Sequence, residues 1–302
     1  MENERLRMDS SNRPETISCY LMGGLGNQLF QIFTTLAYGQ RFNRQVIFPY
    51  SDVLTVGINR PTYWETFLNP LKNNTTFNKS YGFDNNELMM FPVYREPFHH
   101  YRTIPIATDK KLILFGYYQS YKYFEKEKDQ IFSLIGLEKQ QEQIKREFSD
   151  YFDKEYDTIS MHFRLGDYKE KQDFHPIMPY EYYENAMFNI LLYRKYTKPY
   201  KVLYFCERED NSTVSSHIDR LKIKYNAVQF IKVDDSINDW KQLLIMSCCN
   251  NNIIANSSFS WWGGYFNLNP NKIVCYPNIW FGPKANNDVS DMFPISWSFI
   301  KW

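Results

Sequence analysis

Apolar positions along the chain fall into short runs that alternate with segments of helical periodicity. Residues 17–22 form a first apolar run of strand length, and a Gly-rich turn at 23–26 follows it. Beyond that turn, apolar side chains recur three and four positions apart and form one face of a helix. These side chains are Leu29, Ile32, Phe33, Leu36 and Ala37. Residues 45–48 are predicted to form the next strand, which completes a strand–helix–strand unit.

A longer series of the same kind begins after residue 157. Five short, β-branched runs bounded by polar turns predict strands at 158–163, 202–206, 228–233, 252–255 and 272–276. Helical patterns lie between them at 180–193, 214–224 and 237–249. Strands that alternate with helices indicate parallel sheets covered by helices, so we expect an α/β fold.

The two series predict two Rossmann-like domains that face a cleft. We expect a disordered arm at residues 1–16, an N-terminal domain at 17–150 on the acceptor side, and a C-terminal domain at 151–302 that binds the ligand. In open α/β sheets, ligands bind beyond the carboxyl ends of the strands. Motifs that follow predicted strands are therefore the best candidates for function.

The connecting regions of the N-terminal half are less regular. Residues 112–115 are predicted as a further strand, and the charged segment 124–152 is compatible with a helix. Residues 55–108 are rich in Asn, Pro and aromatic side chains and carry no clear period.

Composition narrows the classes of function. Among 302 residues, 35 Lys and Arg nearly balance 34 Asp and Glu, which argues against a general nucleic-acid binder. No apolar run has the length of a transmembrane helix, the start lacks an apolar leader, and the five cysteines form no Cys-Xaa-Xaa-Cys pair. We therefore expect a cytoplasmic protein without a transmembrane segment, and leave peripheral association with a membrane open.

The first motif is Gly-Gly-Leu-Gly-Asn-Gln at 23–28, between a predicted strand and helix. Glycines such as Gly24 and Gly26 let a backbone approach a ligand, and the helix N-terminus offers N–H groups to an anion. The spacing fits neither a dinucleotide fingerprint nor a Walker loop. A tight turn and a phosphate cradle are both open interpretations.

The second motif is His-Phe-Arg-Leu-Gly-Asp-Tyr at 162–168. His162 and Arg164 point to one side of a strand end, and the guanidinium offers a planar fork to two phosphate oxygens. The alternative is a surface pair of Arg164 and Asp167. The convergence of three polar groups favours a functional site.

The third motif is Asn-Ser-Ser-Phe-Ser-Trp-Trp-Gly-Gly at 256–264. Asn256, Ser257 and Ser258 lie at a strand-to-helix turn, where hydroxyl groups cap a helix and bind an anion. Trp261 and Trp262 are predicted to pack in the core.

Acidic residues at strand ends are candidates for a general base, which must reach the proton of a reacting hydroxyl. By position these are Asp167 and Glu207, with His162 as a third option that we favour as a ligand contact. No Asp-Xaa-Asp pattern or metal-ligand spacing is present, so no metal or other cofactor is predicted.

At these residues the chain resembles the α-1,2-fucosyltransferases of glycosyltransferase family 11. Six segments occur in the family's order: GGLGNQLFQIF at 23–33, GYYQSYKYF at 116–124, HFRLGDY at 162–168, PYEYYENA at 179–186, NSSFSWWG at 256–263 and NKIVCYPNIWF at 271–281. The resemblance implies a GT-B fold and inverting transfer of L-fucose from GDP-fucose to a sugar hydroxyl, such as O2 of a galactoside, in glycan biosynthesis.

The resemblance also implies roles for particular residues. His162 and Arg164 match the family's GDP contacts, and the serine turn at 257–259, with Phe259, matches its nucleotide or phosphate contacts. Asn27 and Gln28 match the N-terminal loop that faces the donor.

Two departures from the family pattern concern donor binding. Leu165 stands where many members carry a second Arg, and Gln242 stands where an acidic residue is common. Asp239, three residues earlier on the same helical face, is a candidate to read the guanine instead.

Other functions stay open. One is a fucosyltransferase of another linkage or acceptor, and another is a non-catalytic glycan-binding protein. The high aromatic content, 18%, suits a sugar binder, and Tyr63, Trp64 and Tyr101 are candidates for stacking on the acceptor sugar.

Overall fold

The computed structural model describes residues 14–193, 198–285 and 287–302. Most of the predicted N-terminal arm, residues 1–13, lies outside these ranges. Thr16, which the prediction placed in the arm, already belongs to the first strand. In the described part, no helix combines the length and apolar character that a membrane crossing needs.

The N-terminal half contains a four-stranded parallel sheet in the order β2-β1-β6-β5. Its strands are β1 (Thr16–Cys19), β2 (Gln45–Val46), β5 (Val93–Arg95) and β6 (Lys111–Phe115). Helix α1 (Leu25–Arg41) connects β1 to β2, as the periodicity predicts. An antiparallel hairpin of β3 (Val53–Leu54) and β4 (Arg60–Pro61) precedes the short helix α2 (Asn85–Met89).

The C-terminal half contains a six-stranded parallel sheet in the order β12-β11-β10-β7-β8-β9. Its strands are β7 (Asp157–His162), β8 (Tyr200–Phe205), β9 (Gln229–Lys232), β10 (Asn251–Ile253), β11 (Val274–Pro277) and β12 (Ser298–Ile300). The helices are α5 (Tyr180–Tyr193), α6 (Asn211–Lys224), α7 (Asp239–Cys248) and α8 (Ser258–Tyr265). Helices therefore alternate with parallel strands in this half, as expected for an α/β fold.

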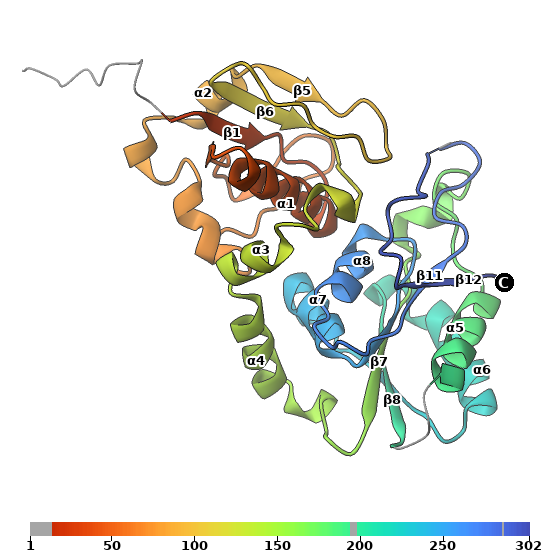
Figure 1. Ribbon diagram of the computed structural model, residues 1–302. Helices are drawn as coiled ribbons and strands as arrows, with labels where there is room; N and C mark the ends of the chain where they lie inside the picture. The colour runs from red at the N-terminus through yellow and green to blue at the C-terminus, as the bar shows by residue number, and fades with distance from the viewer. Residues whose placement is uncertain (1–13, 194–197, 286) are drawn as a thin grey trace, which may run out of the picture.

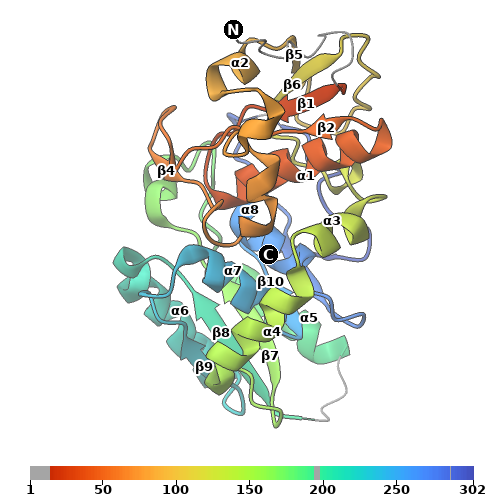
Figure 2. The same ribbon diagram turned by 90° about the vertical axis from the view of Figure 1, so that its left-hand side faces the viewer.

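Two helices link the halves: α3 (Lys128–Leu134) and α4 (Leu137–Glu147). Figure 1 shows them running from the first sheet down along the second, and in Figure 2 α4 lies beside α7, against which it packs. The segment 124–152, expected to be compatible with a helix, contains both α3 and α4, because Gly136 adopts a left-handed φ of +64° between them and ends the first helix. The domain boundary at 150/151 stays a prediction.

One cluster of aromatic residues packs between the two halves, where α1 lies on α8. Phe30 lies 4.5 Å from Trp261 and Phe33 lies 4.5 Å from Trp262, measured between ring centroids, and both tryptophans are fully buried. The indole N–H of Trp262 donates to the carbonyl of Gly26 at 2.9 Å. Packing of Trp261 and Trp262 in the core, as the sequence predicted, is confirmed, and it fixes the first turn of α1 against α8.

The expectation that Tyr63 and Trp64 stack on a sugar is wrong. Their exposed fractions are 4% and 1%, and Trp64 stacks on Phe48 in the core at 5.5 Å. The patternless segment 55–108 also supplies β5, which pairs with β6 and extends the first sheet. A strand of three residues is too short to show a period in the sequence.

Candidate functional site

A cavity of about 520 Å³ lies at the carboxyl ends of β7 and β8, bordered by the N-terminal turns of α1 and α8. Ten of the predicted site residues line it: Gly24, Gly26, Asn27, His162, Arg164, Glu207, Asp239, Ser257, Ser258 and Phe259. As expected for motifs that follow strands of a parallel sheet, the three motifs that begin near positions 24, 162 and 257 lie together in one site. The volume lies in the range of pockets for small molecules.

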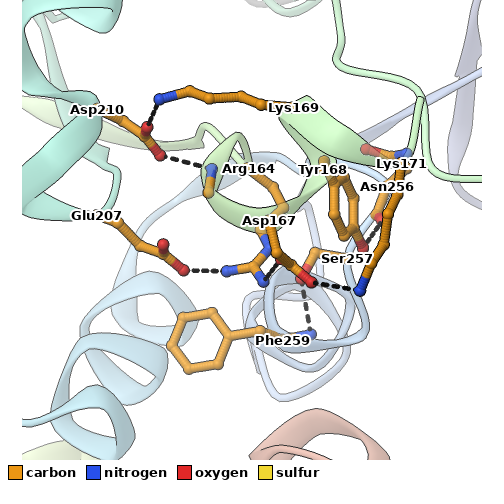
Figure 3. Close-up of polar contacts among 11 residues, drawn as sticks. Arg164, Asp167, Tyr168, Lys169, Lys171, Glu207, Asp210, Asn256, Ser257 and Phe259 are labelled. Carbon is orange, nitrogen blue, oxygen red and sulfur yellow. Dashed lines mark hydrogen bonds and ion pairs between the residues drawn. The ribbon is translucent and has the colours of Figure 1, made fainter.

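Arg164 is the central cation of the site (Figure 3). Its Nη1 pairs with Glu207 at the end of β8, and its Nη2 lies 2.5 Å from Oδ1 of Asp167. The guanidinium carbon lies 5.1 Å from the centre of the Tyr168 ring. Burial acts to lower the pKa of Arg164, but Glu207, Tyr168 and Asp167 outweigh it and hold the pKa above its ordinary value. The guanidinium stays charged and is held in a fixed direction.

The turn that follows β7 and carries Arg164 is held in place by Asp210. Gly166 has a φ of +37°, and its N–H donates to the fully buried carboxylate of Asp210 at 2.8 Å. Lys169 pairs with the other oxygen of that carboxylate at 2.6 Å. The positive φ favours glycine at position 166, and a Cβ there would displace the carboxylate of Glu207.

His162, the last residue of β7, lines the cavity and is 8% exposed. Burial, with smaller contributions from Arg164 and Lys232, lowers the pKa of His162 to about 3. Its Nδ1 is buried without a hydrogen-bond partner in the described part of the chain. The imidazole is therefore neutral near pH 7.

The first turn of α8 forms the opposite wall. The hydroxyl of Ser257 accepts the backbone N–H of Phe259 and caps the helix. The Ser258 hydroxyl donates to Oδ1 of Asn27 at 2.8 Å, a contact between residues 231 positions apart. The predicted capping of the helix by Ser257 is confirmed. Because Ser257 also lines the cavity, binding of an anion at this turn stays a prediction.

Asp239, the first residue of α7, lines the far end of the cavity together with Gln242. One of its carboxylate oxygens accepts the phenol of Tyr63 at 2.5 Å, and the other accepts the backbone N–H of Trp240 at 2.7 Å. The side-chain amide of Gln242 donates to the carbonyl of Ile237. The acidic group that the resemblance led us to look for is thus present in the cavity, at position 239.

Three predicted residues do not line the cavity. Gln28 is 1% exposed and donates to the carbonyls of Gly23 and Pro61. Asn256 donates to the carbonyls of Pro176 and Trp280. Asp167 reaches the cavity only through its pair with Arg164. These contacts give Gln28 and Asn256 a structural role in holding the loops around the site.

Sequence reasoning missed several residues of the cavity wall. Arg60 comes from the hairpin strand β4 in the segment without a pattern, and Arg208 follows Glu207 directly. Arg208 could have been found because it follows the end of a predicted strand, where ligands bind in open α/β sheets. Nothing in the sequence indicated Arg60. In the part of the chain that the structure describes, no cluster of three His, Cys, Asp or Glu side chains is arranged to hold a metal ion.

Comparisons with known proteins identify the family. The family model described as Glycosyl transferase family 11 matches residues 10–301. The O-antigen biosynthesis glycosyltransferase WbnK of Escherichia coli is 28% identical over 196 residues, which cover 61% of this chain and 59% of that protein. An alpha-1,2-colitosyltransferase of Escherichia coli is 26% identical over 195 residues, covering 62% of this chain and 61% of that protein. The match spans about three fifths of the length of these curated relatives.

The fold also resembles a solved structure, that of POFUT1 in complex with GDP-fucose. The TM-score is 0.52 at 11% sequence identity, covering 86% of this chain and 97% of that one. At this identity the likeness concerns the fold alone. The expected α/β fold of the GT-B type is confirmed.

Proposed function

The chain belongs to glycosyl transferase family 11, and we propose that it transfers L-fucose from GDP-fucose to a hydroxyl of a sugar acceptor, forming an α-1,2 linkage with inversion. The observation that carries the proposal is the convergence of Arg164, His162 and the first turn of α8 on one cavity at the strand ends. A fixed guanidinium facing a capped helix N-terminus suits a diphosphate, since both favour negative charge.

The mechanism that fits this site is a direct displacement through an oxocarbenium-like transition state. As the glycosidic bond to the diphosphate breaks, negative charge grows on the leaving oxygen. Arg164, the hydroxyl of Ser257 and the backbone N–H of Ser258 stabilise that charge without having to reorganise. We propose that transfer needs no metal ion, which predicts full activity in excess EDTA.

Arg60 supplies the second cation that Leu165 cannot provide. It lines the same cavity from the N-terminal half, and in the described part of the chain its guanidinium forms no ion pair with a carboxylate. A diphosphate between Arg60 and Arg164 would meet positive charge from both halves.

Asp239 is proposed to read the guanine, because a carboxylate accepts hydrogen bonds from the base's ring and amino N–H groups. The phenol of Tyr63 fixes this carboxylate at the cavity wall.

Glu207 and Asp167 remain the candidates for the general base, and the structure favours Glu207, which lines the cavity while Asp167 does not. Both carboxylates pair with Arg164, so the base becomes free when the donor phosphates take up that guanidinium. Glu207→Gln and Asp167→Asn are compared in pH–rate profiles at saturating donor. A general base must be deprotonated to act, so loss of the acidic limb, on which the rate rises with pH, in Glu207→Gln alone would assign the base to Glu207.

The test of the function is an acceptor panel with GDP-fucose, with GDP release as the readout and NMR of the product to fix the linkage. Because one relative is named a colitosyltransferase, a colitose donor is included beside GDP-fucose. Glycan binding without GDP release would support the glycan-binding alternative. A product linked elsewhere than at O2 would assign another linkage.

A further inference from the structure

We propose that Gln119 is a positioning residue for the transfer reaction: it holds the side-chain amide of Asn27 in one orientation, so that the amide nitrogen faces the cavity. The inference deepens the proposed function and rests on it for the reaction that Asn27 serves. Gln119 does not line the cavity, so it acts through Asn27.

The orientation of Asn27 follows from two donors that point at the same oxygen. Its Oδ1 lies 2.8 Å from Nε2 of Gln119 and 2.8 Å from the hydroxyl of Ser258. If the amide turned over, its NH₂ group would face the NH₂ group of Gln119, and two donors would oppose each other. Gln119 therefore selects one of the two orientations.

The amide nitrogen of Asn27 is then the group left for a ligand. Asn27 lines the cavity, and none of the hydrogen bonds found in the described part of the chain is donated by its Nδ2. Its N–H groups are the donors that Asn27 offers to a ligand oxygen. Donors fixed in advance stabilise developing charge better than donors that must first rotate.

His99 contacts the other end of the Gln119 amide. Its Nε2 lies 3.2 Å from Oε1 of Gln119, and its Nδ1 lies 3.4 Å from the carbonyl of Asp288. With the ring proton on Nε2, His99 donates to Oε1 of Gln119 and leaves the NH₂ group of Gln119 for Asn27, whereas a proton on Nδ1 would be donated to Asp288. The proposal therefore requires the Nε2 tautomer of His99. His99 packs edge-on against Phe281 at 5.0 Å between ring centroids, which holds the ring in place.

The backbone that carries Gln119 is held as firmly. One carboxylate oxygen of Glu96 accepts the N–H groups of Tyr117 and Tyr118 at 2.7 and 2.9 Å. Tyr118 has a left-handed φ of +54°, and the hydroxyl of Ser120 donates to the carbonyl of Asp291 at 2.7 Å. These hydrogen bonds hold the backbone on both sides of Gln119, which restricts the position of its side chain.

A double-mutant cycle on the full chain tests the coupling, using Gln119→Leu, Asn27→Ala and the double variant. We expect Gln119→Leu to lower kcat about tenfold with little change in KM for GDP-fucose, and Asn27→Ala to lower kcat about 100-fold. In the Asn27→Ala background, Gln119→Leu should change kcat less than twofold. Effects that multiply across the cycle would overturn the proposal.

Two further measurements keep the test independent of folding and of the reaction. Gln119→Glu keeps the size of the side chain but replaces its donor by an acceptor, and it should lose as much activity as Gln119→Leu. The Asn27 side-chain NH₂ signals in a ¹⁵N NMR spectrum, assigned by their loss in Asn27→Asp, should shift or broaden in Gln119→Glu and stay unchanged in the neighbouring variant His100→Gln. Unchanged signals would refute the positioning role even if the chain transferred no fucose, whereas absence of transfer by the wild type would refute only the proposed function.

Discussion

The phenol of Tyr63 donates a 2.5 Å hydrogen bond to the carboxylate of Asp239, 176 positions further along the chain. Tyr63 follows the hairpin of the N-terminal half, and Asp239 begins α7 in the C-terminal half. Burial of the phenol, with the charge of Asp239, raises the pKa of Tyr63, so the phenol keeps its proton and stays a donor. The bond connects the N-terminal half to Asp239, the residue proposed to bind the guanine.

Tyr63→Phe should weaken GDP binding about tenfold, because a hydrogen bond to a charged group contributes roughly 1.5–3 kcal/mol and part of that holds Asp239 in place. Isothermal titration with GDP measures the change in Kd. The matched control is Tyr50→Phe. The phenol of Tyr50 donates a 2.5 Å hydrogen bond to Glu65, and neither residue lines the cavity. Equal affinities of Tyr63→Phe and wild type would show that the Asp239 carboxylate needs no support.

Local pattern predicted the parts of the fold whose residues are near neighbours in sequence. The helix at 180–193 has the predicted bounds, and the strand expected at 158–163 is β7, shifted by one residue. The motifs at 162–168 and 256–264 meet because parallel strands share their carboxyl edge, which is a rule of topology that needs no coordinates.

The rest depends on contacts that no local pattern contains. Arg60 lines the cavity from the hairpin, and Tyr63 contacts Asp239 at the cavity wall; both belong to a segment whose sequence shows no period. The partners of Asn27 come from positions 119 and 258, and only the assembled loops show that both point at one oxygen. The sequence therefore predicted which edge of the sheet is used but not which side chains from the other half complete it.

Arg164→Ala should lower kcat about 100- to 1000-fold, the usual cost of removing one preorganised donor from a charged transition state. The fold should survive, since the guanidinium lies at the cavity wall and pairs with the partly exposed carboxylates of Asp167 and Glu207. Initial rates of GDP release and thermal unfolding of the same samples provide both readouts. Arg220→Ala, which removes a cation stacked on Tyr180 outside the cavity, serves as control. Near-normal turnover of Arg164→Ala would remove this residue from the mechanism.

Arg60→Ala should act mainly on donor binding. We expect KM for GDP-fucose to rise about tenfold, as for the loss of one charge-assisted hydrogen bond, with a smaller change in kcat. Arg60→Lys should recover part of the affinity because it restores the charge without the planar fork. A KM that stays at the wild-type value in Arg60→Ala would mean that the diphosphate is held from the C-terminal half alone.

Glu96 should lower the free energy of unfolding as the pH rises, because its carboxyl group is buried. Burial raises the pKa of Glu96 to about 7, although it accepts the N–H groups of Tyr118 and Tyr117. Because the folded state holds this proton more tightly than the unfolded state, the contribution of Glu96 is fully present below pH 4.5. It is lost as pH rises to about 7, at up to about 1.4 kcal/mol per pH unit.

Glu96→Gln cannot ionise, so its free energy of unfolding should rise relative to wild type between pH 4.5 and 7. Urea unfolding at several pH values measures the difference. Glu184→Gln gives the opposite sign: hydrogen bonds from Lys224 and Tyr180 lower the pKa of Glu184, so this variant should be less stable than wild type above pH 4.5 and approach it as the pH falls. Parallel curves for Glu96→Gln and wild type would contradict the ionisation of a buried Glu96.

Gly26→Ala and Gly24→Ala should separate packing from ligand contact in the glycine-rich turn. A Cβ at Gly26 would lie 2.4 Å from the carbonyl carbon of Ser258 and 2.6 Å from the nitrogen of Phe259, which are backbone atoms of the facing helix turn. Overpacking of this kind costs about 1–3 kcal/mol, and the shift would also displace Ser258 from Asn27. Gly26→Ala should therefore unfold at a lower temperature and lose most of its activity.

At Gly24 no atom lies within 4 Å of the added Cβ, and its φ of −75° and ψ of −179° suit any residue, so Gly24→Ala should keep the wild-type unfolding temperature. Any loss of GDP affinity in this variant then measures how closely the donor approaches the backbone at Gly24. A destabilised Gly24→Ala, or a Gly26→Ala with wild-type stability, would contradict the assignment of Gly26 as the point where α1 and α8 touch through their backbones.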